Sequence, residues 1–251
     1  MMHIFVILLA GGTGSRTKTD LPKQFIKIND KYLAEYSILR FRNWFKTINR
    51  EFSMFLPEKM IFVCHKDYLD LSKSLFPYDD LIFTVGGETR HDSTKEGLKM
   101  IKKIALEKQI SLENLVIFIH DVARPIFLTK ELNEVLKVVF HQNNQTCLSL
   151  ASPVVETIVN YNKKHLEALK RNELFAIKTP QILSGKYLNL FLEQPTKETY
   201  TDLITWASDF GIEIELIESI QENIKITYPK DFDFAKILLE YPEFFVDNEI
   251  Q

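Results

Sequence analysis

The sequence predicts a doubly wound, mostly parallel α/β sheet, and three observations support this prediction. Short apolar runs alternate with amphipathic stretches through about residue 150. The apolar runs are followed by loops rich in glycine or charged residues, where ligands of such sheets bind. No internal repeat and no linker-like segment interrupts the 251 residues, so we expect one domain over residues 1–251.

Five apolar segments have the length and composition of strands buried on both faces of a parallel sheet. The first reads Ile-Phe-Val-Ile-Leu-Leu over residues 4–9 and is followed by Gly11-Gly12. The others cover residues 60–64, 81–85, 115–119 and 146–150. A polar or glycine-bearing loop ends each of them, as expected of strands that lead into crossover connections.

Amphipathic helices are expected between and after these strands. Apolar residues recur at i, i+3, i+4, i+7 and i+8 over residues 132–140, and a second stripe covers residues 98–105. From Pro153 to about Lys178 the alternation changes, which indicates an inserted arm. Helices near residues 185–193, 202–210 and 231–239 and a strand at 212–217 are expected after it.

Composition excludes several classes of protein. Hydrophobic residues make up 45% and charged residues 26%, as in ordinary globular proteins, and the net charge of −3 gives no field that attracts nucleic acid. The longest apolar run, residues 4–10, is far shorter than the roughly 18 to 20 residues of a membrane span, and no Lys or Arg precedes it as in a signal peptide. Cys64 and Cys147 are too few for a disulfide framework. We therefore expect a cytoplasmic protein without nucleic-acid or membrane partners.

The most informative stretch is Leu9-Ala-Gly-Gly-Thr-Gly-Ser-Arg16, followed by Leu21-Pro-Lys-Gln24. Glycines directly after a first parallel strand let the backbone approach a phosphate chain, and successive N–H groups form an anion-binding nest. The loop is neither a Walker A loop nor a dinucleotide fingerprint, because it lacks Gly-Lys-Ser/Thr and has Thr17 at the third glycine position. Arg16 and Lys23 suit a phosphoryl centre that gains negative charge. The alternative is a glycine-rich turn with two solvated cations.

The second motif, His120-Asp-Val-Ala-Arg-Pro125, directly follows the apolar run at 115–119. A carboxylate at the end of a central strand, facing a phosphate loop, is a natural Mg²⁺ ligand, because Mg²⁺ favours one or two carboxylates plus substrate phosphates. Asp121 is that candidate, and its alternative role is to cap a turn or helix. We expect His120 to be packed or hydrogen-bonded and Arg124 to pair with Asp121 or a backbone carbonyl.

The third motif, Gly86-Gly-Glu-Thr-Arg-His-Asp-Ser93, leads from a predicted strand into a predicted helix. The two glycines allow a planar base to approach the backbone closely. Ser93 either hydrogen-bonds a ligand or caps the helix, and capping alone also explains Asp92.

Six motifs, in their order along the chain, resemble those of the CTP-dependent polyol-phosphate cytidylyltransferases. Besides the three above they are Pro153-Val-Val-Glu-Thr157, Thr179-Pro-Gln181 and Asn223-Ile-Lys-Ile-Thr227. The resemblance spans about residues 4–240. The group includes enzymes that act on 2-C-methyl-D-erythritol 4-phosphate in non-mevalonate isoprenoid synthesis and on D-ribitol 5-phosphate in teichoic acid and capsule synthesis.

The resemblance implies a single Rossmann-like nucleotidyltransferase domain, with a β-arm at about residues 153–178 that interlocks two subunits into a homodimer. It implies that Arg16 and Lys23 stabilise the charge that develops at the α-phosphorus of CTP. Asp121 would hold Mg²⁺ on the triphosphate. The remaining nucleotide contacts would come from Ala10, Gly11, Gly12, Gly14, Gly86, Gly87 and Ser93.

On the acceptor side, the resemblance implies that Arg171 and Lys225 clamp the polyol phosphate, with Thr157 and Thr179 nearby. Arg171 would reach across the dimer from the arm. The acceptor's phosphate oxygen would attack the α-phosphorus in line and release pyrophosphate, with little need for a general base.

Three positions depart from the family pattern. Thr17 stands where Met commonly follows the arginine, Glu156 replaces the usual Asp before Thr157, and Leu203 occupies a position that is usually acidic in the erythritol enzymes. The last two are expected on the acceptor side, so they bear on the acceptor and not on CTP. We expect 2-C-methyl-D-erythritol 4-phosphate, with ribitol 5-phosphate or another capsular polyol phosphate as the alternative.

A third alternative is a nucleotide-binding homologue without turnover. Such proteins tend to lose their charged catalytic residues, whereas this chain keeps Arg16, Lys23 and Asp121. The sequence therefore favours an active enzyme.

Overall fold

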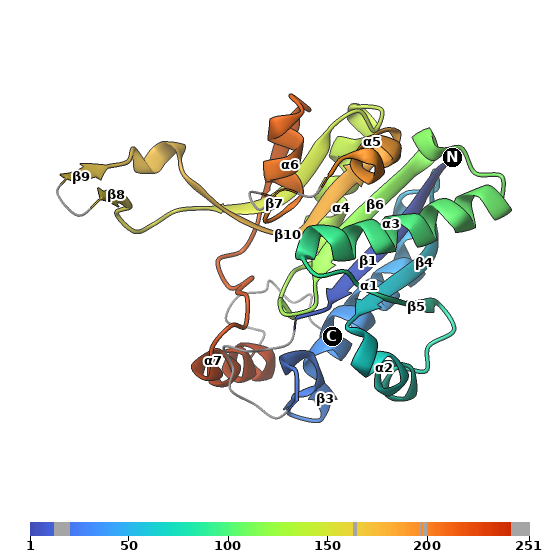
Figure 1. Cartoon of the computed structure of the whole chain (residues 1–251), viewed down its shortest axis with the longest axis horizontal. Helices are drawn as coiled ribbons and strands as arrows, with labels where there is room; N and C mark the ends of the chain where they lie inside the picture. Colours follow the sequence, from blue (N-terminus) through green and yellow to red (C-terminus); the bar gives the residue numbers. More distant parts are fainter. Residues whose placement is uncertain (13–20, 163–164, 196, 198–199, 242–251) are drawn as a thin grey trace.

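The computed structural model describes residues 1–12, 21–162, 165–195, 197 and 200–241 (Figure 1). Its centre is a seven-stranded sheet in the order β11-β7-β10-β6-β1-β4-β5. The strands are β1 (Met2–Ala10), β4 (Phe55–Cys64), β5 (Leu81–Val85), β6 (Leu115–Asp121), β7 (Cys147–Pro153), β10 (Phe175–Ser184) and β11 (Ile214–Glu218). Only β10 runs against its neighbours in this sheet, so the prediction of a mostly parallel sheet is confirmed.

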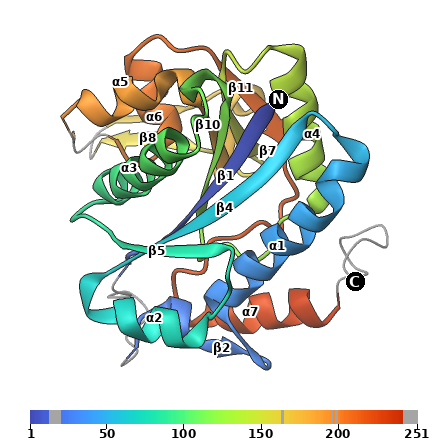
Figure 2. The same cartoon turned by 90° about the vertical axis from the view of Figure 1, so that its right-hand side faces the viewer.

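Helices cover both faces of the sheet (Figure 2). One face packs against α1 (Leu33–Glu51), α2 (Leu69–Leu75) and α4 (Thr129–His141), and the other against α3 (Arg90–Glu107), α5 (Leu188–Glu193) and α6 (Leu203–Asp209). Among the described helices, none combines the length and the apolar character that a membrane span needs. Short 3₁₀ turns lie at Lys23–Phe25, Lys66–Tyr68, Leu112–Asn114, Arg171–Glu173 and Gly185–Tyr187.

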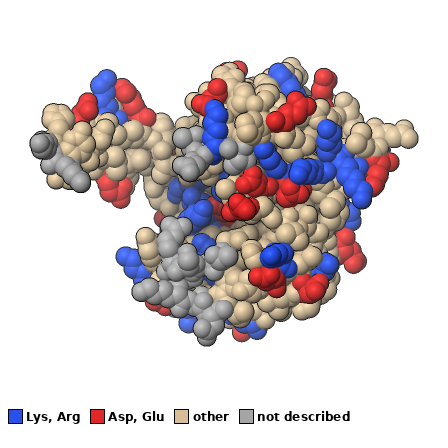
Figure 3. Space-filling view, in the orientation of Figure 1, with Lys and Arg blue, Asp and Glu red and all other residues tan. Residues whose placement is uncertain are grey.

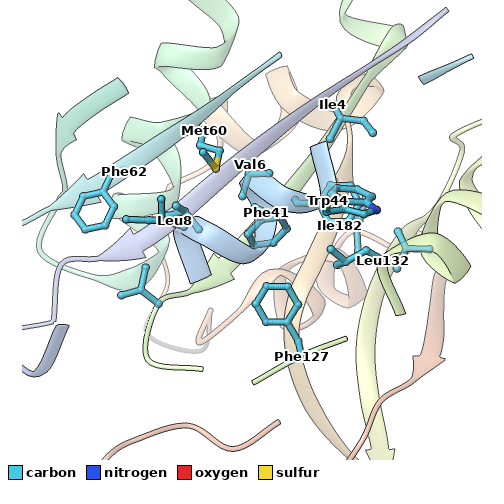
Figure 4. Close-up of a cluster of buried hydrophobic side chains, with 14 of the residues drawn as sticks. Ile4, Val6, Leu8, Phe41, Trp44, Met60, Phe62, Phe127, Leu132 and Ile182 are labelled. Carbon is cyan, nitrogen blue, oxygen red and sulfur yellow. The ribbon is translucent and has the colours of Figure 1, made fainter. Parts of the chain in front are cut away.

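The alternation of side chains along β1 divides the core into two layers. Ile4, Val6 and Leu8 point toward α1 and α4, where they pack with Phe41 and Trp44 (Figure 4). The residues between them, Phe5, Ile7 and Leu9, point toward α3 and α5. Both sets are buried because successive side chains of a strand face opposite sides of the sheet.

The elements expected from the apolar runs are present, but α1 and β10 were not expected. The apolar face of α1 carries Ile38, Phe41, Trp44 and Ile48 at helical spacing. Strand β10 contains the polar stretch Lys178-Thr-Pro-Gln181, which looks like a loop in the sequence. Its polar side chains are buried because other elements supply their hydrogen-bond partners.

The arm leaves the body between β7 and β10 (Figure 1). It carries an antiparallel hairpin of β8 (Val159–Asn162) and β9 (His165–Ala168). Phe175, Ala176 and Ile177 pair with the end of β7, so the segment outside the sheet runs over residues 154–174 and not to Lys178 as expected. A separate small sheet of β2 (Lys27–Ile28) and β3 (Lys31–Tyr32) packs near the final helix, α7 (Pro229–Glu240).

Candidate active site

A pocket of about 230 Å³ lies at the carboxyl ends of β1 and β6, where ligands were expected. Leu9 of β1 pairs with Asp121 of β6, so the glycine loop and the carboxylate emerge side by side. Four of the sequence motifs meet here. They contribute Leu9, Gly11, Gly12, Lys23, Gly87, Glu88, Thr89, Arg90, Ser93, Asp121, Ala123 and Lys225.

Gln24 fixes the start of the glycine loop. Its buried side-chain amide donates hydrogen bonds to the carbonyl oxygens of Ala10 at 2.6 Å and Gly12 at 3.1 Å. The next residue toward the N-terminus, Lys23, donates from Nζ to the carbonyl oxygen of Ile226 at 2.7 Å. The Pro-Lys-Gln segment therefore both orients the loop and places a cation on the pocket wall. Arg16 and Gly14, two predicted site residues, lie outside the described residues.

Asp121 is the last residue of β6 and is held between two cations. Arg90 Nε donates to its Oδ1 at 2.8 Å, and Lys225 Nζ donates to its Oδ2 at 2.6 Å. Burial acts to raise the pKa of the Asp121 carboxyl, but Arg90 and Lys225 outweigh this effect and hold the pKa well below its usual range. Asp121 is thus an anion in a basic site, not a turn cap.

Sequence reasoning did not single out Arg90, which lies in the first turn of α3. Thr89 and Asp92 form a capping box that begins this helix, as expected for Asp92. Arg90 Nη2 also contacts Gln181 Oε1 at 3.4 Å. A signal was available, because Arg90 follows the two glycines in a loop expected to bind nucleotide, but its partner lies 31 residues away in sequence.

The glycine pair after β5 leaves no room for side chains. A Cβ added to Gly86 would lie 2.7 Å from Ser93 Oγ, and one added to Gly87 would lie 2.3 Å from Asp92 Cβ. Ser93 Oγ donates to the Gly87 carbonyl oxygen at 3.4 Å, and Thr89 is the residue that caps α3. The helix cap that the sequence allowed for Ser93 is therefore provided by Thr89.

His120 precedes Asp121 in β6 and is fully buried. Its Nε2 faces the carbonyl oxygen of Arg124 at 3.0 Å, so Nε2 carries the proton, and Nδ1 accepts from the Thr179 hydroxyl at 3.0 Å. Burial lowers the pKa of His120 to about 3. The same Thr179 hydroxyl accepts from the backbone N–H of Asp121 at 3.2 Å. Thr179 is therefore used inside the protein to position Asp121.

The loop that carries Lys225 is held by Arg124 and Asn223. Arg124 Nη1 donates to the Asn223 carbonyl oxygen at 2.8 Å, which confirms the predicted pairing with a backbone carbonyl. The Asn223 side chain in turn donates to the carbonyl oxygen of Thr179 at 3.0 Å. These bonds bring Lys225 to β6, more than 100 residues away in sequence.

Two predicted acceptor residues lie away from this pocket. Thr157 and Arg171 are exposed on the arm, as is Glu156, and Arg171 Nη1 donates to the Val155 carbonyl oxygen at 3.1 Å. The expectation that Leu203 faces the acceptor was wrong. Its side chain is buried in the apolar layer with Phe191, because it begins the α6 helix that packs against the sheet.

The donor set around Asp121 fits one kind of metal site. Among the described residues there is no group of three or more His, Cys, Asp or Glu side chains that would hold a metal by itself. A single carboxylate at a phosphate loop fits Mg²⁺ that takes its other ligands from substrate phosphates and water.

Comparisons with known proteins agree on one family. The family model for 2-C-methyl-D-erythritol 4-phosphate cytidylyltransferase matches residues 4–241. A protein of that name from Leptospira interrogans is 32% identical over 239 residues, covering 93% of this chain and 91% of the relative. Another, from Wigglesworthia glossinidia brevipalpis, is 29% identical over 249 residues, covering 98% and 96%.

Solved structures show the same fold. The 4-diphosphocytidyl-2C-methyl-D-erythritol synthase of Anaerococcus prevotii aligns with a TM-score of 0.72 at 22% identity, covering 95% of this chain and 96% of that one. The bifunctional IspDF protein of Campylobacter jejuni aligns with a TM-score of 0.70 at 23% identity, covering 92% of this chain and 53% of that one.

Proposed function

The chain belongs to the family of 2-C-methyl-D-erythritol 4-phosphate cytidylyltransferases, and from this membership we propose how its residues divide the work of that reaction. The protein is a CTP-dependent cytidylyltransferase of isoprenoid synthesis. It transfers CMP to 2-C-methyl-D-erythritol 4-phosphate and releases pyrophosphate. The acceptor expected from the sequence is thus the one that the family supports.

One observation carries the assignment of residues: a glycine loop, Lys23, Asp121 and Lys225 line the same pocket. In-line transfer needs an ionised acceptor phosphate, an α-phosphate and groups that stabilise the charge on the phosphoryl oxygens. We assign charge stabilisation to Lys23 and to Arg16. Because the acceptor phosphate is already an anion, no general base is assigned.

The nucleotide contacts are assigned to backbone and small residues. Ala10 is the last residue of β1 and is followed by Gly11 and Gly12, and Gly87, which follows Gly86, lines the same pocket together with Ser93. Gly14 belongs to the same sequence motif as Arg16 and is assigned with this group. The absence of side chains at the glycines lets the base and phosphates approach backbone N–H groups. Asp121 would hold Mg²⁺, which would neutralise charge on the triphosphate.

The acceptor site is proposed to form between two subunits. Lys225 lies in the pocket of its own chain, whereas Thr157 and Arg171 lie on the arm. Large apolar side chains on the arm are exposed, including Val155, Tyr161 and Leu166, and a partner subunit would cover them. We therefore propose a homodimer in which each arm supplies Arg171 and Thr157 to the other subunit's pocket. Thr179 would act through Asp121.

A cytoplasmic location is also proposed. It is supported by Cys64 and Cys147, which are buried and free, as in proteins of reducing compartments. Partners other than CTP, the acceptor and the second subunit are not proposed.

The test is pyrophosphate release from CTP and Mg²⁺, with 2-C-methyl-D-erythritol 4-phosphate and ribitol 5-phosphate in parallel and ATP, GTP and UTP as nucleotide controls. Release with CTP and the erythritol acceptor is expected. Release with ribitol 5-phosphate alone would contradict the assignment of 2-C-methyl-D-erythritol 4-phosphate as the acceptor. No release with either acceptor, in a protein that still binds CTP, would contradict the assignment of the residues.

A further inference from the structure

The carboxylate of Asp121 has both oxygens engaged by cations of its own chain. Arg90 binds Oδ1 and Lys225 binds Oδ2, at 2.8 Å and 2.6 Å. These are the atoms that a divalent cation would use. We propose that Arg90 is a positioning residue that competes with the divalent cation for Asp121, so that the cation enters the site together with the triphosphate. This inference rests on the proposed function of Asp121 as the cation ligand.

Arg90 is held in place and is not a mobile surface group. The capping box of Thr89 and Asp92 fixes the first turn of α3, from which Arg90 projects. Its Nη2 contacts Gln181 Oε1, and that buried oxygen also accepts the backbone N–H of Leu203 at 3.1 Å. The Arg90 side chain is 21% exposed, and that of Asp121 is 9% exposed. The ion pair is therefore partly shielded from water. Its Coulomb attraction is stronger than that of a fully exposed pair, because the effective dielectric constant is lower there.

The charge balance favours joint entry of cation and nucleotide. Two cations surround one carboxylate, so a bare divalent ion would meet net positive charge and would have to displace a placed arginine. A triphosphate changes this balance, because its oxygens are partners for Arg90 and supply ligands for the cation. Basic side chains gather on the face where the arm leaves the body, with acidic ones beside them (Figure 3).

The proposal is tested by Mn²⁺ binding to the full chain without nucleotide, followed by electron paramagnetic resonance. The wild type should bind Mn²⁺ weakly. R90Q and R90M remove the charge, and each should bind Mn²⁺ about tenfold more tightly or better, because one of the two cations that compete for Asp121 is gone and Oδ1 is released. Two variants are used so that a folding defect in one leaves the other as the test. R90K keeps the charge and should stay close to wild type.

A matched control and a double variant complete the design. R42Q breaks an arginine–aspartate pair with the same 2.8 Å contact, to Asp80, away from the pocket, and should leave Mn²⁺ binding unchanged. R90Q/D121N should lose the gain of R90Q, which would locate the cation at Asp121. Equal Mn²⁺ affinity in wild type, R90Q and R90M would overturn the proposal.

The outcome can be separated from that of the proposed function. The same wild-type preparation is assayed for pyrophosphate release with CTP and 2-C-methyl-D-erythritol 4-phosphate. Activity together with unchanged Mn²⁺ binding in R90Q would overturn the role of Arg90 alone. A gain of Mn²⁺ affinity that persists in R90Q/D121N would overturn Asp121 as the cation ligand, and the role of Arg90 with it.

Discussion

The pocket beside β6 and the arm beyond β7 both carry residues assigned to the reaction, but they are stabilised differently. In the pocket, buried side chains orient the groups that line it: Gln24 holds the glycine loop, and Thr179, which is hydrogen-bonded to His120, holds Asp121. On the arm, β8, β9 and the turn with Arg171 are exposed along their length. The pocket is therefore organised within one chain, whereas the arm leaves apolar side chains exposed, which the proposed partner subunit would cover.

The largest expected effect is on the pocket. K23A should lower kcat by at least about a hundredfold, or about 3 kcal/mol of transition-state stabilisation, because a preorganised cation near the α-phosphate is lost. The free energy of unfolding should change little. K46A, an exposed lysine on α1, is the control. Near wild-type turnover in K23A would contradict the role of Lys23 in the reaction. It would also weaken the contrast drawn between the pocket and the arm.

A smaller effect, confined to the acceptor, is expected on the arm. R171A should raise the KM for the acceptor by about tenfold to a hundredfold and leave the KM for CTP unchanged, because one charged hydrogen-bonding partner of the acceptor phosphate is lost. Steady-state kinetics with each substrate varied in turn would measure both values. An equal rise in both KM values would contradict a role on the acceptor side alone.

Mixing variants sharpens this prediction. In a dimer of one K23A subunit and one R171A subunit, one site keeps its own Lys23 and receives Arg171 from the partner. The assay uses an acceptor concentration far below the KM of R171A, where neither variant alone has much activity. After random exchange of equal amounts, half of the dimers are mixed and each has one intact site, so activity should rise to about a quarter of that of the wild type. No rise in activity after exchange would mean that Arg171 does not act across the dimer.

The sequence predicted the pocket better than it predicted the packing around it. Asp121 follows an apolar run that could be recognised as a central strand. Its position just after that run places it at the carboxyl end of the strand, where ligands bind. Strand β10 was missed because Lys178 and Thr179 are polar, and their hydrogen-bond partners come from distant segments. The same cause hid the pairing of Arg90 with Asp121. For α1 the spacing of Ile38, Phe41 and Trp44 was a sufficient signal.

For the arm, the sequence predicted the position but not the exact boundary. Its position after β7 was visible as a change in alternation, but its end was not, because Phe175 and Ile177 continue as sheet pairing with β7. Leu203 was assigned to the acceptor from its place in a motif. Its side chain is buried, since apolar residues at the start of α6 face the sheet. A motif gives the neighbourhood of a residue, and packing decides which way it points.

A buried histidine in the first turn of α3, His91, also predicts a dependence of stability on pH. Burial lowers the pKa of His91 to about 4, and the ring stacks on Phe191 with centroids 4.4 Å apart. Between about pH 6.5 and 4 the unfolded chain binds a proton at His91 that the folded chain does not, so the unfolding free energy falls as pH falls. H91F should reduce this fall by about 1 kcal/mol. Urea unfolding at pH 7, 5.5 and 4.5 measures it, and equal slopes in both proteins would contradict it.

The smallest effect on folding, and the sharpest contrast with the pocket, is expected for an exposed apolar residue of the arm. Leu166 is 60% exposed in β9, so L166S should change the unfolding free energy of a single chain by less than about 0.5 kcal/mol. If a partner covers this residue, the same change should weaken the dimer by about 1 kcal/mol or more, since burial of apolar area is lost.

Sedimentation should show the wild type near twice 29.4 kDa and L166S shifted toward the single chain at low concentration. L106S serves as the control, because Leu106 is similarly exposed on α3, away from the arm. A wild type that stays a monomer at micromolar concentration would mean that the arm completes no second pocket, and Arg171 would then have no partner site to serve.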